Sequence, residues 1–134
     1  PNNREDWKQK MMNEKIAFLT TELNITPEEG QVFWPVYNKV NQEKDAAMRN
    51  VFKAYRNLAK ATEEGVKGKE LEKLLKEYLN AQQAQREVEE ENAEKFMKVL
   101  STEKTAKLYL AEERFRRRQI HKLNHGNNHR DQQK

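Results

Sequence analysis

A five-residue pattern occurs twice in this chain, and each copy has the chemistry of a helix start. The copies are Ile25-Thr26-Pro27-Glu28-Glu29 and Leu100-Ser101-Thr102-Glu103-Lys104. In both, an aliphatic residue precedes a hydroxyl residue that can cap the free backbone N–H groups of a first helical turn, and a carboxylate follows where the helix dipole favours it. Because the copies lie about 75 residues apart, the pattern predicts a duplicated helical hairpin.

The first copy is the stronger helix start. Thr26 and Glu29 have the spacing of a capping box, and Pro27 stands at the first helical position, where proline is well tolerated. In the second copy Ser101 takes the capping position, but Lys104 replaces the glutamate. We expect Thr26, Glu29 and Ser101 to act as structural residues at two helix N-termini.

The composition is that of long helices joined by few turns. Only four glycines and three prolines occur among 134 residues, and 36% of the residues are charged. With 35% hydrophobic residues the chain is poor in core-forming side chains, which excludes a large globular core. The apolar spacing predicts an all-α fold, a single helical domain over residues 1–123. Its four helices are expected at about residues 4–23, 27–62, 69–99 and 102–123.

The second and third predicted helices form a long antiparallel central hairpin, with the other two helices flanking it. Their one glycine-rich connection, residues 63–68, is short enough to force neighbouring antiparallel helices. Both helices are polar at mid-length, where Lys44 is expected near Glu87 and Glu91. So thin an apolar stripe buries too little to offset the conformational entropy lost on folding. We therefore predict a homodimer that buries more of the hairpin.

The densest positive cluster lies near the C-terminus, at Arg114 and residues 116–118, in a chain of net charge +4. Such a run suggests nucleic-acid binding, but ion pairing is the preferred interpretation. If the fourth helix folds back on the third, Arg114 lies beside Glu87, Glu90 and Glu91, and paired charges explain both clusters. Anionic lipid headgroups and acidic unfolded segments are alternative targets for unpaired arginines.

Three histidines, His121, His125 and His129, are spaced four residues apart. On a continuous helix they would share one face, which is a spacing that suits zinc, nickel or copper. The asparagines and the glycine among them favour a disordered tail over residues 124–134 instead. A weak metal site is therefore the alternative, and no other cofactor is predicted.

Catalysis has no candidate residues in this sequence, and we predict a protein that is not an enzyme. The chain has no cysteine, which excludes a disulfide, a thiol nucleophile and a thiolate metal site. It contains no glycine-rich phosphate loop and no nucleophile elbow. No stretch approaches the roughly 18 apolar residues of a membrane span. The first residue is Pro1 rather than methionine, so we expect that an N-terminal segment has been removed.

Without catalysis, the predicted role is binding of another molecule, and large side chains outside the core are the candidate binding residues. We expect Phe33, Tyr37 and Phe115 in the core. Flexible methionines beside charged groups suit a surface that adapts to varied segments. The predicted client or partner residues are Met12, Met48, Phe52, Arg114, Arg117 and Arg118.

The duplicated motif resembles the repeated Leu-Thr-x-x-Gln signature of the Spy/CpxP family of bacterial periplasmic stress proteins. The resemblance covers about residues 7–123, although neither copy carries the final glutamine and the first has isoleucine for leucine. The run Phe33-Trp34-Pro35-x-Tyr37 and residues 111–115 resemble a diverged Bacteroidetes branch. That branch is described as sensors linked to extracytoplasmic-function sigma factors.

The resemblance implies a cradle-like all-α dimer that is exported to the periplasm, with the signal peptide absent from the given chain. It also implies a non-enzymatic envelope stress protein that binds unfolded or exposed apolar segments of clients as a chaperone without ATP. The alternative is a periplasmic sensor or regulator that docks on a membrane signalling partner or binds a divalent metal. Selectivity discriminates between them, since a chaperone binds many clients and a sensor binds one partner or ion.

Overall fold

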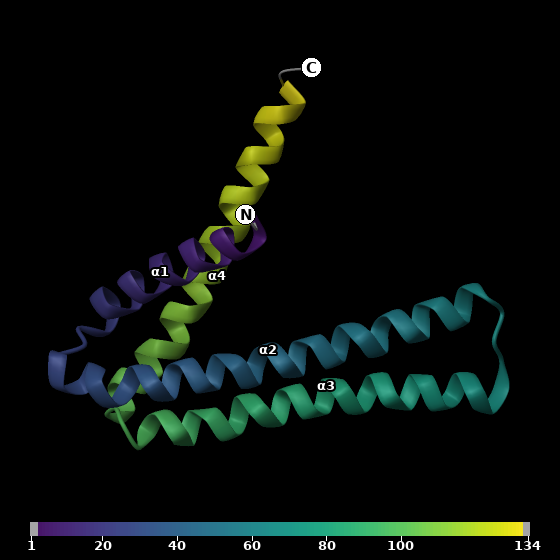
Figure 1. Ribbon diagram of the computed structural model, residues 1–134, viewed down its shortest axis with the longest axis horizontal. Coiled ribbons are helices and arrows are strands. Elements are labelled where there is room, and N and C mark those ends of the chain that lie inside the picture. The colour runs from purple at the N-terminus through teal and green to yellow at the C-terminus, as the bar shows by residue number, and fades with distance from the viewer. Residues whose placement is uncertain (1–2, 133–134) are drawn as a thin grey trace. The chain divides into compact units, whose positions relative to one another are not determined.

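The computed structural model describes residues 3–132, and side chains through residue 126; these residues form four α-helices and no strand. The helices are α1 (Asn3–Leu23), α2 (Pro27–Glu63), α3 (Gly68–Met97) and α4 (Thr102–Gln132) (Figure 1). The predicted all-α fold, with its long central hairpin, is confirmed. None of the described helices combines the length and apolar character needed to cross a bilayer.

The chain divides into two compact units. Unit 1 contains Pro1–Gly30 and Leu100–Lys134, and unit 2 contains Gln31–Val99. Unit 1 therefore holds α1, the first turn of α2, and α4, whereas unit 2 is the hairpin made by the rest of α2 and α3. The single domain predicted over residues 1–123 stays a prediction.

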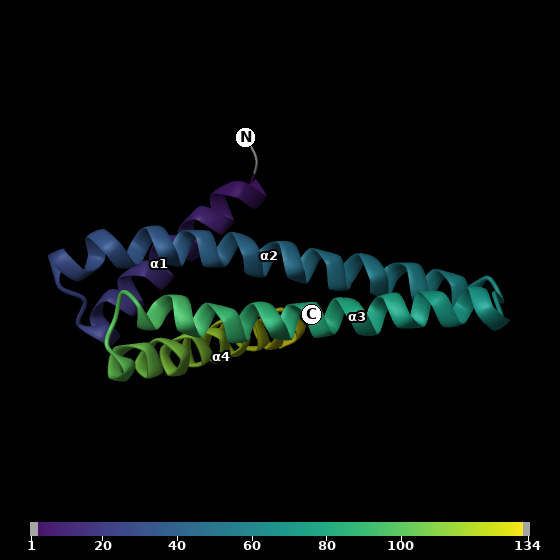
Figure 2. The same ribbon diagram turned by 90° about the horizontal axis from the view of Figure 1, so that it is seen from below.

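Unit 2 is an antiparallel pair of helices that lie side by side in both views (Figures 1 and 2). Its turn depends on Gly65 and Gly68, whose φ angles of 75° and 71° lie in the left-handed region that glycine adopts without steric cost. The N–H of Val66 donates to the carbonyl oxygen of Ala61 at 2.9 Å. This bond closes the C-terminus of α2 in the way that a left-handed residue after a helix commonly does.

The core of the hairpin is aromatic at the open end and narrow elsewhere. Phe33, Tyr37 and Phe96 are almost completely buried, and the Phe33 and Phe96 ring centroids lie 5.8 Å apart. Toward the turn, the buried residues of α2 are Ala47 and Ala61. Alanine allows two helices to approach closely but buries little area, so larger side chains nearby remain outside the seam between the helices.

Two ion pairs join α2 and α3 at mid-length. Lys44 Nζ lies 3.5 Å from a carboxylate oxygen of Glu89, which stands between the two glutamates expected as its neighbours. Lys95 Nζ lies 3.0 Å from Glu43 Oε2. Because all four side chains retain solvent contact, each pair contributes only about 0–1 kcal/mol, and the pairs serve mainly to fix the register.

Asn92, on α3, has a buried polar side chain. It is 0% exposed, and neither its amide nitrogen nor its amide oxygen has a hydrogen-bond partner. The amide nitrogen of Asn41 on α2 is likewise buried without a partner. Such groups lose their hydration without compensation, so this part of the hairpin is less stable than an apolar version of it would be.

Replacing Asn92 with leucine should therefore raise the free energy of unfolding by on the order of 1 kcal/mol, since an unsatisfied buried polar group costs about 1–3 kcal/mol. Urea unfolding followed by circular dichroism measures the change. Asn80→Leu, on an exposed position of the same helix, is the control and should change stability by less than about 0.5 kcal/mol. A destabilised Asn92→Leu protein would contradict the assignment of Asn92 as an unpaired group.

Unit 1 is built on the packing of α1 against α4, which run in opposite directions. Leu19, Leu23 and Leu108 are fully or almost fully buried, and the rings of Phe18 and Phe115 lie 5.7 Å apart. The expected neighbours of Arg114 on α3 were wrong, because its guanidinium lies 2.9 Å from Glu22 on α1. Phe115 is buried as predicted, and its contact with Phe18 explains why this face of α4 turns toward α1.

Helix α4 is longer than the sequence predicts. It continues to Gln132, so the disordered tail expected from residue 124 is wrong for residues 124–132, while residues 133–134 lie outside the described residues. No proline follows Leu123, and an asparagine or glycine costs a helix only up to about 1 kcal/mol. Because propagation of a formed helix is easier than nucleation, these residues extend α4 rather than end it.

The two copies of the capping motif meet in unit 1. Thr26 and Glu29 form the predicted capping box, with the N–H of each donating to the side chain of the other at 3.1 and 3.2 Å. Ser101 accepts the N–H of Lys104 at 3.1 Å. Lys104 Nζ then donates to Glu29 Oε1 at 2.6 Å and to the carbonyl oxygen of Asn24 at 3.0 Å. One ammonium group thus joins the end of α1, the start of α2 and the start of α4.

Thr26→Ala should lower the free energy of unfolding by about 1 kcal/mol, because the substitution removes the acceptor for an otherwise unpaired N–H of the first turn. Thr20→Ala makes the same chemical change at an exposed position inside α1, where the hydroxyl donates only to its own helix at Ile16. That control should be neutral or slightly stabilising, since alanine is the better helix former. Equal losses in the two variants, measured by urea unfolding, would contradict the role assigned to the cap.

Candidate functional site

Three large apolar side chains of α2 line one exposed face of the hairpin. Met48, Phe52 and Tyr55 are 45%, 53% and 55% exposed. Their spacing of four and then three residues places them on the same side of a helix. They extend over about 10 Å at a rise of 1.5 Å per residue.

Two leucines of α3 belong to the same face. Leu75 and Leu79 are 44% and 50% exposed, and they are spaced for one side of α3. The Lys44–Glu89 ion pair identifies the adjacent sides of the two helices, because Met48 follows Lys44 by about one turn and Leu75 precedes Glu89 by about four. The Tyr55 and Tyr78 rings lie 6.0 Å apart, which shows that this part of α2 lies opposite this part of α3. We define the hairpin patch as Met48, Phe52, Tyr55, Leu75 and Leu79.

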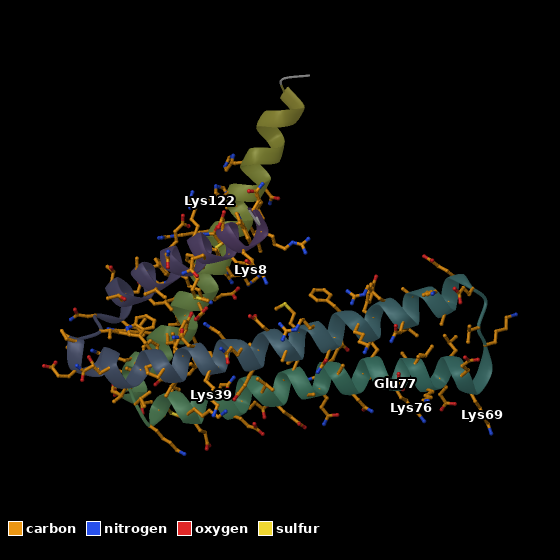
Figure 3. All side chains as sticks on the ribbon, viewed as in Figure 1. Lys8, Lys39, Lys69, Lys76, Glu77 and Lys122 are labelled. Atoms are coloured by element: carbon orange, nitrogen blue, oxygen red, sulfur yellow. The ribbon has the colours of Figure 1, made fainter. Side chains whose placement is uncertain are left out.

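The predicted exposure of Met48 and Phe52 is confirmed, whereas the exposure of Leu75 and Leu79 was not predicted from the sequence. A spacing of three and four residues marks an apolar stripe without showing how much of its width the partner helix covers. The signal that could have indicated this exposure is the presence of Ala47, Ala54 and Ala61 on α2. Small side chains between two helices cover only part of a wide apolar stripe, so the large residues at its edge stay exposed. Figure 3 shows the charged side chains of Lys69 and Lys76 projecting from the hairpin near its turn.

The other predicted binding residues belong to unit 1 and are engaged there. Met12 is half-buried on α1. Arg114 is paired with Glu22, Arg117 donates to Glu113 at 3.1 Å, and the Arg118 guanidinium lies 5.0 Å from the centre of the Phe18 ring. These arginines therefore have structural partners, as ion pairing predicted, although the partners are not those expected.

An open surface hollow of about 430 Å³ lies along α4, lined by Arg117, Arg118, His121 and Lys122. Its positive lining favours anions over metal cations. The rings of His121 and His125 lie 4.3 Å apart, so the continuous helix brings these two histidines together. Among the described side chains no group of three or more potential metal ligands gathers, and the side chain of His129 lies outside them. The zinc, nickel or copper site stays a prediction.

No protein-family model, curated protein sequence or solved structure matches the chain. The resemblance of the capping motifs to the Spy/CpxP signature therefore stays a prediction.

Glu113 provides a test of the charge network on α4. Its pKa lies at about 2, below the ordinary 4.5, because Arg116 donates to the carboxylate at 2.6 and 3.0 Å and Arg117 adds a third hydrogen bond. Since the folded-state pKa is depressed, the stabilisation from these bonds is complete above about pH 4.5 and is lost as the pH falls toward 2.

Carbon NMR of the Glu113 carboxylate should show a titration midpoint near pH 2, and Arg116→Gln should move that midpoint upward toward 4.5. Arg114→Gln is the matched control and should leave the midpoint unchanged, because Arg114 pairs with Glu22. A midpoint near 4.5 in the unmodified protein would show that the arginines do not hold Glu113 in solution.

Proposed function

We propose that this protein binds exposed apolar segments of unfolded or partly folded client proteins at the hairpin patch, without ATP and without catalysis. The observation that carries the proposal is the exposure of five large apolar side chains, each between 44% and 55%, on one face of two packed helices. Contiguous apolar surface of this kind is uncommon on a monomer and typically marks an interaction site.

The energetics suit reversible binding. Burial of apolar surface contributes about 25 cal/mol per Å², but association also costs several kcal/mol in lost translational and side-chain freedom. A five-residue patch leaves a modest surplus, which favours weak capture and release over permanent association. Met48 adds adaptability, because its unbranched thioether packs against irregular surfaces.

The cellular setting is a proposal of its own. The duplicated capping motif and the four-helix layout support an exported periplasmic stress protein of the Spy/CpxP type that assembles as a cradle-like homodimer. In the alternative, a regulatory sensor, the same patch docks on a single signalling partner. The number of different clients that bind separates the two, because a sensor surface is selective.

The protein at stoichiometric amounts, without ATP, should suppress aggregation of two unrelated denatured model proteins measured by light scattering. The double substitution Met48→Ser and Phe52→Ser should weaken suppression several-fold, because it removes apolar contact area from the centre of the patch. Since both side chains are half exposed, the variant should keep its helical circular dichroism spectrum.

Val32→Ser with Leu110→Ser is the matched control, since these side chains are 52% and 64% exposed and lie outside the patch. This variant should suppress aggregation as well as the unmodified protein does. Equal loss in both double variants would indicate general surface hydrophobicity rather than the patch. No suppression of either client by the unmodified protein would overturn the chaperone proposal.

A further inference from the structure

Three arginines border the hairpin patch, and none has an ion-pair or hydrogen-bond partner among the described residues. Arg49 and Arg56 directly follow Met48 and Tyr55, so they lie about 100° around α2 from those two residues, on the side away from α3. Arg86 follows Leu79 by seven residues, about two turns of α3, and continues the same row. All three side chains are exposed.

Two lysines near the patch have carboxylate partners. Lys76 pairs with Glu72 at 3.0 Å, and Lys44 pairs with Glu89 at 3.5 Å. Asp45 lies about one turn before Met48 and Arg49, and Glu89 and Glu90 lie about one turn after Arg86, so carboxylates accompany the arginines at the Met48 end of the patch, and Arg56 lies nearer the turn. The patch is therefore an apolar strip with guanidinium groups at its edges.

We propose that the hairpin patch recognises an amphipathic α-helix whose apolar stripe is flanked by Asp and Glu residues. This inference rests on the proposed function and specifies its ligand. Arginine is suited to this role, because its planar guanidinium can bind a carboxylate through two hydrogen bonds. The arginines select among apolar segments by charge, and the five apolar residues supply the contact area.

The length and the chemistry of the patch both fit a helix. Its extent of about 10 Å equals two helical turns, so three apolar residues at positions i, i+3 or i+4, and i+7 of a ligand helix span it. The backbone N–H and C=O groups of α2 and α3 are already paired within their own helices. An extended segment would leave its own backbone groups unpaired against this surface, whereas a helix satisfies its own.

A second copy of the chain is a poor occupant of the same face. In a two-fold dimer the same patch meets itself, which brings six unpaired guanidinium groups into one interface. Like charges placed together in an interface cost several kcal/mol. If the proposed homodimer forms, we expect it to use another face.

The test uses the full chain and two synthetic 18-residue helical peptides with the same leucine stripe. One peptide carries glutamate on both sides of the stripe, and the other carries lysine. Fluorescence anisotropy at low salt should show at least tenfold tighter binding of the glutamate peptide, and the preference should shrink as salt screens the charges. Equal affinity for both peptides would overturn the inference and leave the proposed function intact, whereas binding of neither would overturn both.

The variant Arg49→Glu, Arg56→Glu and Arg86→Glu should reverse the preference, and the corresponding glutamine variant should abolish it. The control with the same charge change, Lys39→Glu, Lys53→Glu and Lys73→Glu, alters exposed lysines on other faces and should keep the preference. A preference retained by both arginine variants would overturn the inference, and the glutamine variant decides the matter if the glutamate variant misfolds.

Two further outcomes would reassign the patch. Binding to phosphatidylglycerol vesicles that requires the three arginines, together with equal peptide affinities, would assign it to a membrane surface. A solution mass of twice the chain that falls to the monomer mass in the Met48→Ser, Phe52→Ser variant would assign it to a second copy. Either outcome overturns the proposed helix recognition.

Discussion

The contact between Lys104 and Glu29 organises unit 1. The Lys104 ammonium group lies 2.6 Å from the Glu29 carboxylate and 3.0 Å from the Asn24 carbonyl oxygen. It lies where the end of α1 and the starts of α2 and α4 meet. The hydrogen bond from Lys104 is the main cause that lowers the pKa of Glu29, and the N–H of Thr26 adds to it. Asn24, with φ of 51°, turns the chain so that its carbonyl faces this ammonium. The fifth positions of the two motif copies have thus diverged into partners of opposite charge.

Local chemistry could be predicted from the sequence, and long-range choices could not. The helix starts at Pro27 and Thr102 follow from capping, in which the cap and the N–H groups it satisfies lie within four residues. The partner of Arg114 could not be chosen, because 26 basic and 22 acidic residues offer many ion pairs of similar energy. The end of α4 was missed because weak helix formers after Leu123 reduce stability without imposing a stop.

The candidate site shows the same division. The exposure of Met48 and Phe52 followed from their position beside an already apolar stripe of α2. The exposure of Leu75 and Leu79 could not be predicted, since periodicity gives the direction of a stripe but not the width that a neighbouring helix covers. That width depends on how closely the two helices approach each other, which is visible only when they are placed together.

The buried alanines of α2, Ala47 and Ala61, also affect how the conformational entropy lost on binding is divided between the hairpin and its ligand. Alanine has no side-chain rotamers to redistribute, so the hairpin beneath the patch offers few alternative packings when a ligand arrives. Met48 is the most adaptable patch side chain, and the backbone on which it stands is already ordered. A ligand helix that folds on this surface would therefore lose more conformational entropy than the hairpin does. The intrinsic helix propensity of the ligand would then be as important for affinity as its contacts with the patch.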